Sequence, residues 1–273
     1  MERPNGFVEV RRAGIELLVA AECAHVDPEA WFDTGAPLAD AKGRGSGVGR
    51  LDIEGRAVVV RTYRRGGLLR RALPDAFPTS ARAVRELLTL ARLRDAGVPV
   101  VAPICAASRR RGPLRELRLA TLLIEGALPL PAFVARHPDL RRVAVRAAGE
   151  VVGQAFAVGL VHPDLHPDNL VAAPSDGGCT VHLLDLDRAR IAASPDRVPR
   201  GAMLVRMARY LLRHRDTLPV RAQWTDRIRF LAGLGLDRAE RRGLVVELGP
   251  ELQRQAARRN LTLDPLPGSP AVR

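Results

Sequence analysis

Hydrophobic positions follow two different spacings along this chain, and the change comes near residue 125. Before that point most apolar stretches are short and of strand length, at positions 51–53, 57–60 and 117–125. After it, apolar residues recur every three or four positions, the interval of an amphipathic helix. These later stretches are 141–156, 202–214, 225–233 and 237–259. The pattern predicts an α+β protein with a β-rich first lobe and a helical second lobe.

One helix is expected inside the β-rich part, over residues 80–96. Ser80 stands where a helix cap is expected, and Gly97 with Pro99 provides an end. Glu86 lies one position away from the apolar stripe of this helix, which consists of Val84, Leu87, Leu88 and Ala91. The Glu86 carboxylate is either a solvated charge favoured by the helix dipole or the partner of a cation from elsewhere in the chain.

The connector 126–131 is rich in Gly, Leu and Pro and separates the two patterns, so it is the expected lobe boundary. We therefore expect a first lobe over 41–126 and a second lobe over 127–262. Residues 1–40 carry no recognisable motif and are either an N-terminal extension or the start of the first lobe. The tail 263–273, with its prolines and glycine, is expected to be disordered.

The composition is that of a soluble globular protein, with 47% hydrophobic and 27% charged residues in a chain of 273. No apolar run reaches the roughly 18 residues of a membrane-spanning helix. Acidic residues interrupt the N-terminus where a signal peptide would have an apolar core, so a cytoplasmic location is expected. Three scattered cysteines suggest neither a disulfide framework nor a zinc site.

The formal net charge is +13, and nearly all the cations are arginines, because Lys42 is the only lysine. Either an anionic partner or a coding bias toward arginine explains this charge. Candidate partners are nucleic acid, an anionic lipid surface and a phosphorylated substrate. Aromatic residues, only 4% of the chain, are not interleaved with the basic ones, which argues against single-stranded nucleic acid. The run 109–112 is expected to be a solvated hairpin tip.

The most specific chemistry lies in His162-Pro163-Asp164-Leu165-His166-Pro167-Asp168-Asn169, followed after an apolar run by Asp185-Leu186-Asp187. Phosphoryl transfer from ATP needs a carboxylate that accepts the proton of the attacking hydroxyl. It also needs an amide oxygen and a second carboxylate that hold Mg²⁺, a cation that prefers oxygen ligands. The motif makes Asp164 the candidate catalytic base, and Asn169 and Asp185 the candidate metal ligands. The alternative is a solvated turn that matches by coincidence.

Two upstream features fit the same chemistry. The glycine-rich stretch 42–50 could bring backbone N–H groups close to phosphates. Its spacing departs from G-x-G-x-x-G, and a hairpin without a ligand is the alternative; the candidate residues are Gly43, Gly45 and Gly47. Arg61 ends the next strand, where kinases carry a lysine, and its guanidinium can fork onto a carboxylate or a phosphate. We assign Arg61 to nucleotide binding, with Glu86 as its partner.

Taken together, these residues resemble a 3-deoxy-D-manno-octulosonic acid (Kdo) kinase of the lipopolysaccharide-core kinase family, a bacterial branch of the protein-kinase-like fold. The resemblance extends from about residue 40 to about residue 215. Its most specific piece is Tyr63-Arg64-Arg65-Gly66-Gly67. The other segments that carry it are Gly43–Ser46, Arg85–Leu88 with Gly97–Val100, and His162–Asn169 with Asp185–Arg188.

The resemblance implies a two-lobed protein-kinase-like fold and Mg²⁺- and ATP-dependent phosphorylation of a Kdo hydroxyl in lipopolysaccharide biosynthesis. The implied partners are the anionic Kdo-lipid A precursor and, peripherally, the cytoplasmic face of the inner membrane, without nucleic acid. Basic residues near an anionic surface contribute about 1 kcal/mol each. The cluster that could meet the glycolipid, or form an ordinary solvated face, is Arg64, Arg65, Arg70 and Arg71.

Three alternatives remain open. A phosphotransferase for an aminoglycoside, a heptose or an amino alcohol would usually have an acidic acceptor pocket, which the basic balance of this chain opposes. For an atypical protein kinase, residues 191–200 are short for an activation loop and contain no A-P-E motif. A non-catalytic pseudokinase that binds nucleotide is opposed by the intact set of Asp164, Asn169 and Asp185. Leu186 replaces the aromatic residue usual in the family but removes no chemical group.

Overall fold

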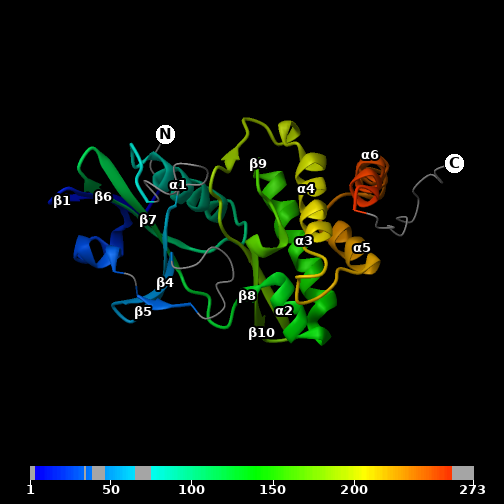
Figure 1. Ribbon diagram of the computed structural model, residues 1–273, viewed down its shortest axis with the longest axis horizontal. Helices are drawn as coiled ribbons and strands as arrows, with labels where there is room; N and C mark the ends of the chain where they lie inside the picture. Colours follow the sequence, from blue (N-terminus) through cyan, green and yellow to red (C-terminus); the bar gives the residue numbers. More distant parts are fainter. Residues whose placement is uncertain (1–3, 34, 39–46, 65–74, 260–273) are drawn as a thin grey trace. The chain divides into compact units, whose positions relative to one another are not determined.

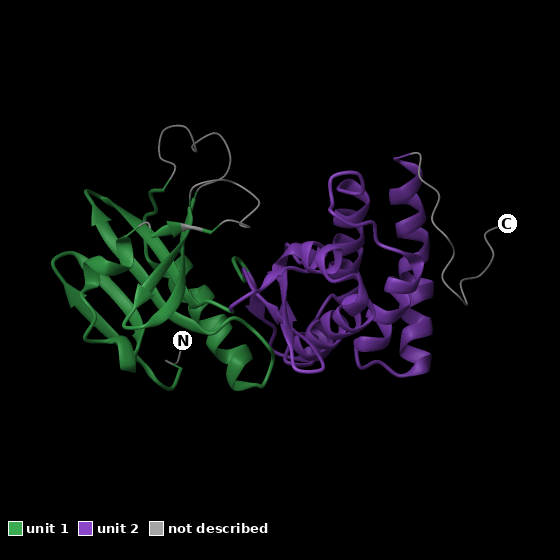
Figure 2. Ribbon diagram, turned by 90° about the horizontal axis from the view of Figure 1, so that it is seen from below, with its two compact units in different colours: residues 1–124, 186–188 green, residues 125–185, 189–273 purple. Residues whose placement is uncertain are grey.

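The computed structural model describes residues 4–33, 35–38, 47–64 and 75–259 (Figure 1). The chain divides into two units, which Figure 2 colours separately. Unit 1 contains residues 1–124 and the short segment 186–188, and unit 2 contains 125–185 and 189–273. The described helices include none that is both long enough and apolar enough to cross a membrane. The tail 263–273 lies outside the described residues.

Unit 1 is built on an antiparallel seven-stranded sheet in the order β1-β2-β6-β7-β5-β4-β3. Its first two strands come from the N-terminal stretch in which no motif was recognised, and the second of them pairs with β6. The described part of residues 1–40 is therefore built into the same sheet as the later strands. The strands are β1 (Phe7–Arg12), β2 (Ile15–Ala20), β3 (Ala36–Pro37), β4 (Val48–Ile53), β5 (Arg56–Thr62), β6 (Pro103–Arg111) and β7 (Leu114–Leu122).

The helix expected at 80–96 is present as α1 (Ala81–Asp95), which packs against β6 and β7. Gly97, with a φ of +79°, ends it, as expected of a residue without a Cβ. The expectation for Ser80 was wrong. Its backbone is already in the right-handed helical region, and its side chain makes no capping hydrogen bond. A capping side chain normally requires an extended backbone at that position.

Alternation along β5 decides which of its side chains enter the core. Val58 and Val60 are buried on one face with Trp31 and Phe32 of the 3₁₀ segment η2 (Pro28–Phe32). Successive side chains of a strand point to opposite faces, so Arg61 lies on the other face, where α1 provides its partner. The alternation along β5 thus places the Arg61 guanidinium on the face of the sheet that α1 covers.

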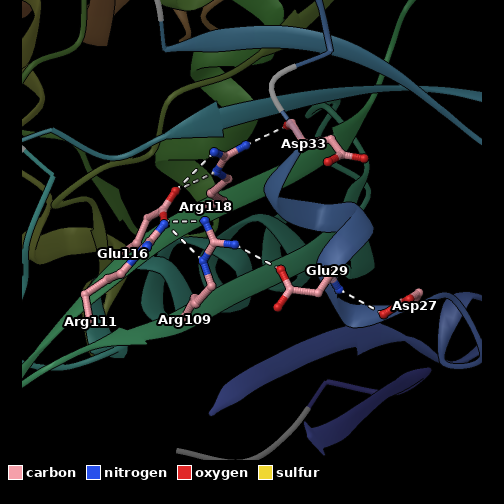
Figure 3. Close-up of polar contacts among 7 residues, drawn as sticks. All are labelled: Asp27, Glu29, Asp33, Arg109, Arg111, Glu116 and Arg118. Atoms are coloured by element: carbon pink, nitrogen blue, oxygen red, sulfur yellow. Dashed lines mark hydrogen bonds and ion pairs between the residues drawn. The ribbon is translucent and has the colours of Figure 1, made fainter. Parts of the chain in front are cut away.

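A cluster of charged residues ties η2 to the β6–β7 hairpin (Figure 3). Glu116 accepts hydrogen bonds from Arg109 (Nη2, 2.8 Å), Arg111 (Nη2, 3.2 Å) and Arg118 (Nη2, 3.0 Å). Arg109 and Arg118 also reach back to Glu29 and to the Asp33 carbonyl, and both guanidiniums lie over the Phe32 ring. We call Glu116 with these three arginines the Glu116 cluster. The expected solvated tip is wrong for Arg109, whose side chain is only 23% exposed.

Unit 2 is mainly helical, as the second half of the hydrophobic pattern predicts. Its helices are α2 (Leu130–Arg136), α3 (Arg141–Ala157), α4 (Arg200–Arg213), α5 (Trp224–Gly233) and α6 (Arg238–Ala257). A three-stranded sheet in the order β11-β10-β8 and a pair β12-β9 complete it. These strands are β8 (Leu128–Pro129), β9 (Leu160–Val161), β10 (Leu170–Ser175), β11 (Gly178–Leu183) and β12 (Arg190–Ile191).

Glycines allow α3 and α5 to pack at close range. A Cβ added at Gly149 would lie 2.1 Å from the Phe230 carbonyl oxygen, and one at Gly153 would lie 2.3 Å from the Leu234 carbonyl oxygen. Neither backbone atom can move aside without displacing its helix. The two glycines, one turn apart on α3, therefore set the distance between the helix that precedes the His162–Asn169 loop and its neighbour.

Candidate active site

The expected pair of Arg61 and Glu86 forms within unit 1. Arg61 Nη2 lies 2.6 Å from Glu86 Oε1 and 2.5 Å from Oε2. Glu86 is 2% exposed, so it is not the solvated first-turn charge of the alternative hypothesis. A buried carboxylate without a cation would cost several kcal/mol. The arginine side chain is 27% exposed and is therefore still accessible at the edge of the pair.

Tyr63, to which the sequence hypothesis gave no role, is a second partner of Glu86. Its hydroxyl donates a hydrogen bond of 2.5 Å to Glu86 Oε2, and its ring is buried. Burial, reinforced by the negative charge of Glu86, raises the pKa of Tyr63 well above its usual value. The phenol therefore stays protonated and acts as a donor. The Arg61 guanidinium lies over its ring at 4.8 Å from the centroid.

Arg82 of α1 connects this pair to the Asp-Leu-Asp segment. Its Nε donates to Asp187 Oδ1 at 2.8 Å, and its Nη2 donates to Asp187 Oδ2. The same guanidinium lies 5.2 Å from the ring centroids of both Tyr63 and Phe77. Burial alone would raise the pKa of Asp187, but the hydrogen bonds and charge of Arg82 outweigh it and lower the pKa. We call Arg61, Tyr63, Arg82, Glu86 and Asp187 the Tyr63 cluster.

In unit 2, His162 organises the loop that carries the predicted base. This side chain is 1% exposed, and its Nδ1 accepts a hydrogen bond from the Asp164 backbone N–H at 3.1 Å. The hydrogen must then be on Nε2, which lies 3.0 Å from the Asp185 carbonyl oxygen and donates to it. Burial lowers the pKa of His162 despite the nearby charge of Asp185, and so favours the neutral ring that this arrangement needs.

The three predicted catalytic and metal-binding residues surround this histidine. Asn169 Nδ2 donates to the Asp164 carbonyl oxygen at 3.1 Å. The amide oxygen of Asn169 is not used in this bond and remains an acceptor. Asp164 is exposed, and no described residue donates a hydrogen bond to its carboxylate. Asp185 has a φ of +55°, a left-handed conformation that is costly for a residue other than glycine. Such strain is common where a side chain must point in one functional direction.

The oxygen set fits a magnesium ion that is bound together with a nucleotide. The described part of the chain contains no group of three or more His, Cys, Asp or Glu side chains that could hold a metal ion alone. Asn169 and Asp185 would hold Mg²⁺ as a pair of oxygen ligands, because this ion usually keeps waters and takes further ligands from phosphates.

Only part of the glycine-rich loop lies within the described residues. Gly43 and Gly45 lie outside the described residues, as do Arg65, Arg70 and Arg71. The Gly47 carbonyl accepts a hydrogen bond of 2.6 Å from the Thr62 N–H, and a Cβ there would meet nothing closer than 3.5 Å. Among the described residues, none thus requires a glycine at position 47. Arg64 lies 3.6 Å from the Asp75 carboxylate.

A second support of the loop was not predicted. Tyr210 of α4 donates a hydrogen bond to Asp168, and its ring stacks on His166 with centroids 4.5 Å apart and planes 9° from parallel. Burial and the Asp168 carboxylate raise the pKa of Tyr210. The available signal was a tyrosine at helical spacing from the buried residues Met203 and Met207. These contacts help fix the 3₁₀ turn η5 (Pro167–Asn169), which carries Asn169.

Comparison with known proteins places the chain in one family. Residues 28–230 match the lipopolysaccharide kinase (Kdo/WaaP) family. The chain is 30% identical over 207 residues to a 3-deoxy-D-manno-octulosonic acid kinase of Stenotrophomonas maltophilia, covering 72% of this chain and 76% of that one. It is 28% identical over 177 residues to a kinase of the same name from Vibrio vulnificus, covering 63% of this chain and 73% of that one.

A solved structure supports the fold independently. The chain is similar to WaaP in complex with acyl carrier protein, with a TM-score of 0.54 and 20% identity, over 84% of this chain and 92% of that one. At this identity the likeness shows the fold alone, and it confirms the predicted α+β, kinase-like architecture. With the family match over most of its length, the chain belongs to the lipopolysaccharide kinase (Kdo/WaaP) family and is a kinase.

Proposed function

We propose that this kinase transfers the γ-phosphoryl group of ATP to a hydroxyl of Kdo in the inner core of lipopolysaccharide, with the Kdo-lipid A precursor as acceptor. One observation carries the proposal. The neutral ring of His162 bonds the backbone of both Asp164 and Asp185, and the Asn169 amide is fixed on the same loop. Phosphoryl transfer needs a base and two oxygen ligands in this order, so the fixed backbone of this loop supports those roles for Asp164, Asn169 and Asp185. The names of the relatives supply the acceptor.

Asp164 accepts the proton of the attacking sugar hydroxyl. Its carboxylate is exposed, so that an incoming hydroxyl can reach it, and its backbone is held at both the N–H and the carbonyl. Asn169 and Asp185 hold Mg²⁺, which when bound neutralises charge on the phosphates. Arg61, steadied by Glu86, contacts the phosphates of the nucleotide, a role to which an arginine fork is suited. Gly43, Gly45 and Gly47 belong to the phosphate loop in this proposal.

The anionic glycolipid also explains part of the basic charge. Arg206, Arg209 and Arg213 are exposed at helical spacing on one face of α4, and none of them forms a salt bridge with a residue in the described ranges. Such a face suits peripheral contact with the cytoplasmic surface of the inner membrane, as do Arg64 and its neighbours in sequence. Each arginine near an anionic surface contributes about 1 kcal/mol.

The direct test is phosphate transfer from labelled ATP, with Mg²⁺, to a Kdo-bearing lipid A precursor. An aminoglycoside and a generic basic protein serve as competing acceptors, and Asp164→Ala is the control for the base. Transfer to the Kdo lipid alone, lost in Asp164→Ala while ATP still binds, is the expected result. Transfer to another acceptor instead would agree with kinase activity but would contradict Kdo as the substrate.

A further inference from the structure

The Tyr63 cluster joins two parts of unit 1 that have different roles in the proposed reaction. On one side is the ion pair of Arg61 with Glu86, which we assign to the nucleotide phosphates. On the other side is the segment 186–188, which directly follows the metal ligand Asp185. We propose that Tyr63 and Arg82 are positioning residues that couple the phosphate-binding pair to this segment, so that Mg²⁺-dependent nucleotide binding requires the intact cluster. This inference rests on the proposed function.

The geometry of Arg82 is that of a clamp on the segment. Both oxygens of Asp187 are bonded by the Nε and Nη2 of one guanidinium, a two-point contact that fixes direction as well as distance. Leu186, between the two aspartates, is 0% exposed and anchors the same segment. Only one residue separates Asp185 from Asp187. The contacts of Asp187 therefore restrict the path of the backbone that leaves Asp185.

The cluster is also balanced in charge. Two guanidiniums, those of Arg61 and Arg82, lie over the single buried ring of Tyr63. The hydrogen bond and the charge of Asp187 raise the pKa of Arg82 and outweigh burial and the nearby charge of Arg61. The carboxylates of Glu86 and Asp187 compensate them, one for each arginine. The Tyr63 hydroxyl adds a donor to Glu86. The two ion pairs are connected through Tyr63, because the guanidinium of each pair lies over this ring and the hydroxyl donates to Glu86.

Two other roles would fit part of this arrangement. The cluster could stabilise unit 1 without affecting nucleotide binding. Alternatively, Asp187 could itself be a metal ligand that is bonded to Arg82 until the metal binds. Three variants separate these roles. Arg82→Ala removes the clamp and leaves the Asp187 carboxylate in place. Asp187→Asn removes the charge with little change in volume. Arg92→Ala, at an exposed position of α1 without a side-chain bond to any described residue, is the matched control.

The experiment measures the dissociation constant of a non-hydrolysable ATP analogue with and without Mg²⁺, by calorimetry on the full chain. The ratio of the two constants reports the benefit from the metal and needs no acceptor. We expect Arg82→Ala and Asp187→Asn each to reduce this ratio about tenfold, and the double variant to be no worse than either. Arg82→Lys keeps the charge but loses the two-point contact, so its ratio should lie between those of Arg82→Ala and the parent. Arg92→Ala should have the ratio of the parent.

A second readout uses the protein without nucleotide. Hydrogen exchange of the amides at 186–188 should become faster in Arg82→Ala and Asp187→Asn, and remain unchanged in Arg92→Ala. Unchanged metal ratios in both folded variants would overturn the proposal, and so would additive losses in the double variant. If the ratio of dissociation constants falls in Asp187→Asn but stays at the parent value in Arg82→Ala, the proposal is wrong and Asp187 is itself a metal ligand. Because no sugar is involved, failure of the Kdo assignment leaves this test intact.

Discussion

The Glu116 cluster and the Tyr63 cluster use the same chemistry on opposite faces of one sheet. In each, carboxylates are held by arginines that also lie over an aromatic ring, Phe32 in the first and Tyr63 in the second. The Glu116 cluster ends at the Glu29 side chain of η2 and at the carbonyl of Asp33, which directly follows η2 (Figure 3). The Tyr63 cluster ends in a residue assigned to nucleotide phosphates and in the segment after Asp185. In the proposed function, the position of an ion pair on the sheet, rather than its composition, decides whether the pair supports the fold or serves nucleotide binding.

The largest effect should follow from Glu86→Ala in the Tyr63 cluster. The change leaves Arg61 without its carboxylate and the buried Tyr63 hydroxyl without its acceptor. Breaking a buried pair by removing one partner costs about 3–5 kcal/mol. We expect that loss in urea denaturation together with weaker ATP binding in the material that remains folded. Normal ATP affinity in folded protein would show that this cluster is no more functional than the other.

Glu116→Gln should change stability without changing catalysis. Glutamine keeps the volume and one acceptor oxygen but loses charge-assisted hydrogen bonds from Arg109 and Arg118. Such bonds contribute about 2 kcal/mol. The free energy of unfolding should fall by about that amount, while kcat and the KM for ATP stay at the parent values. A kinetic defect at full stability would contradict the comparison.

Tyr63→Phe tests one hydrogen bond inside the functional cluster. The ring and its contacts with both guanidiniums are retained, and only the donor to Glu86 Oε2 is lost. We expect a loss of stability of about 1–2 kcal/mol and a rise in the KM for ATP that exceeds any fall in kcat. Tyr210→Phe is a suitable comparison, since it also removes one hydroxyl donor to a carboxylate, here the partly buried bond to Asp168 in unit 2.

The smallest effect is the pH dependence of stability. In the folded protein the pKa of Glu116 is lowered from 4.5, because hydrogen bonds from Arg109 and Arg118 outweigh burial, and the pKa of Asp187 is lowered from 3.8 by Arg82. The unfolded chain then binds more protons, so both groups stabilise the fold above their ordinary values and lose that contribution as pH falls through the folded ones. Denaturation between pH 7 and 3 should show this decline, with a shallower slope in Glu116→Gln than in the parent.

Much of the site could be predicted because it is local in sequence. His162, Asp164 and Asn169 lie within one turn-rich stretch, and their order alone predicted a base and one metal ligand on the same loop, where the structure brings them together. The helix 80–96 was predictable for the same reason, since its apolar interval is contained in a single segment. Arg61 and Glu86 were paired correctly only because the motif around Asp164 suggested a kinase-like arrangement.

The contacts that the sequence did not reveal join positions far apart in the chain. Arg82 with Asp187, Tyr63 with Glu86 and Tyr210 with Asp168 each involve different elements. Arginine is so frequent here that the sequence did not single out Arg82 or Arg109 as the partner of a particular carboxylate, and Arg109 was expected at a solvated hairpin tip. The error at Ser80 has a local cause, because a cap depends on backbone angles as well as on residue type.

The sequence by itself determined the order of chemical groups, the periods of the elements and the change from strands to helices, because these depend on neighbours along the chain. Apart from the pair of Arg61 and Glu86, only the tertiary structure decided which arginine meets which carboxylate. That choice depends on strand register, on the face to which each side chain points and on which helix covers that face. The ion pairs described above join residues that are far apart in the sequence, and they form where packing has partly excluded water. The spacing of residues along the chain does not show which positions those are.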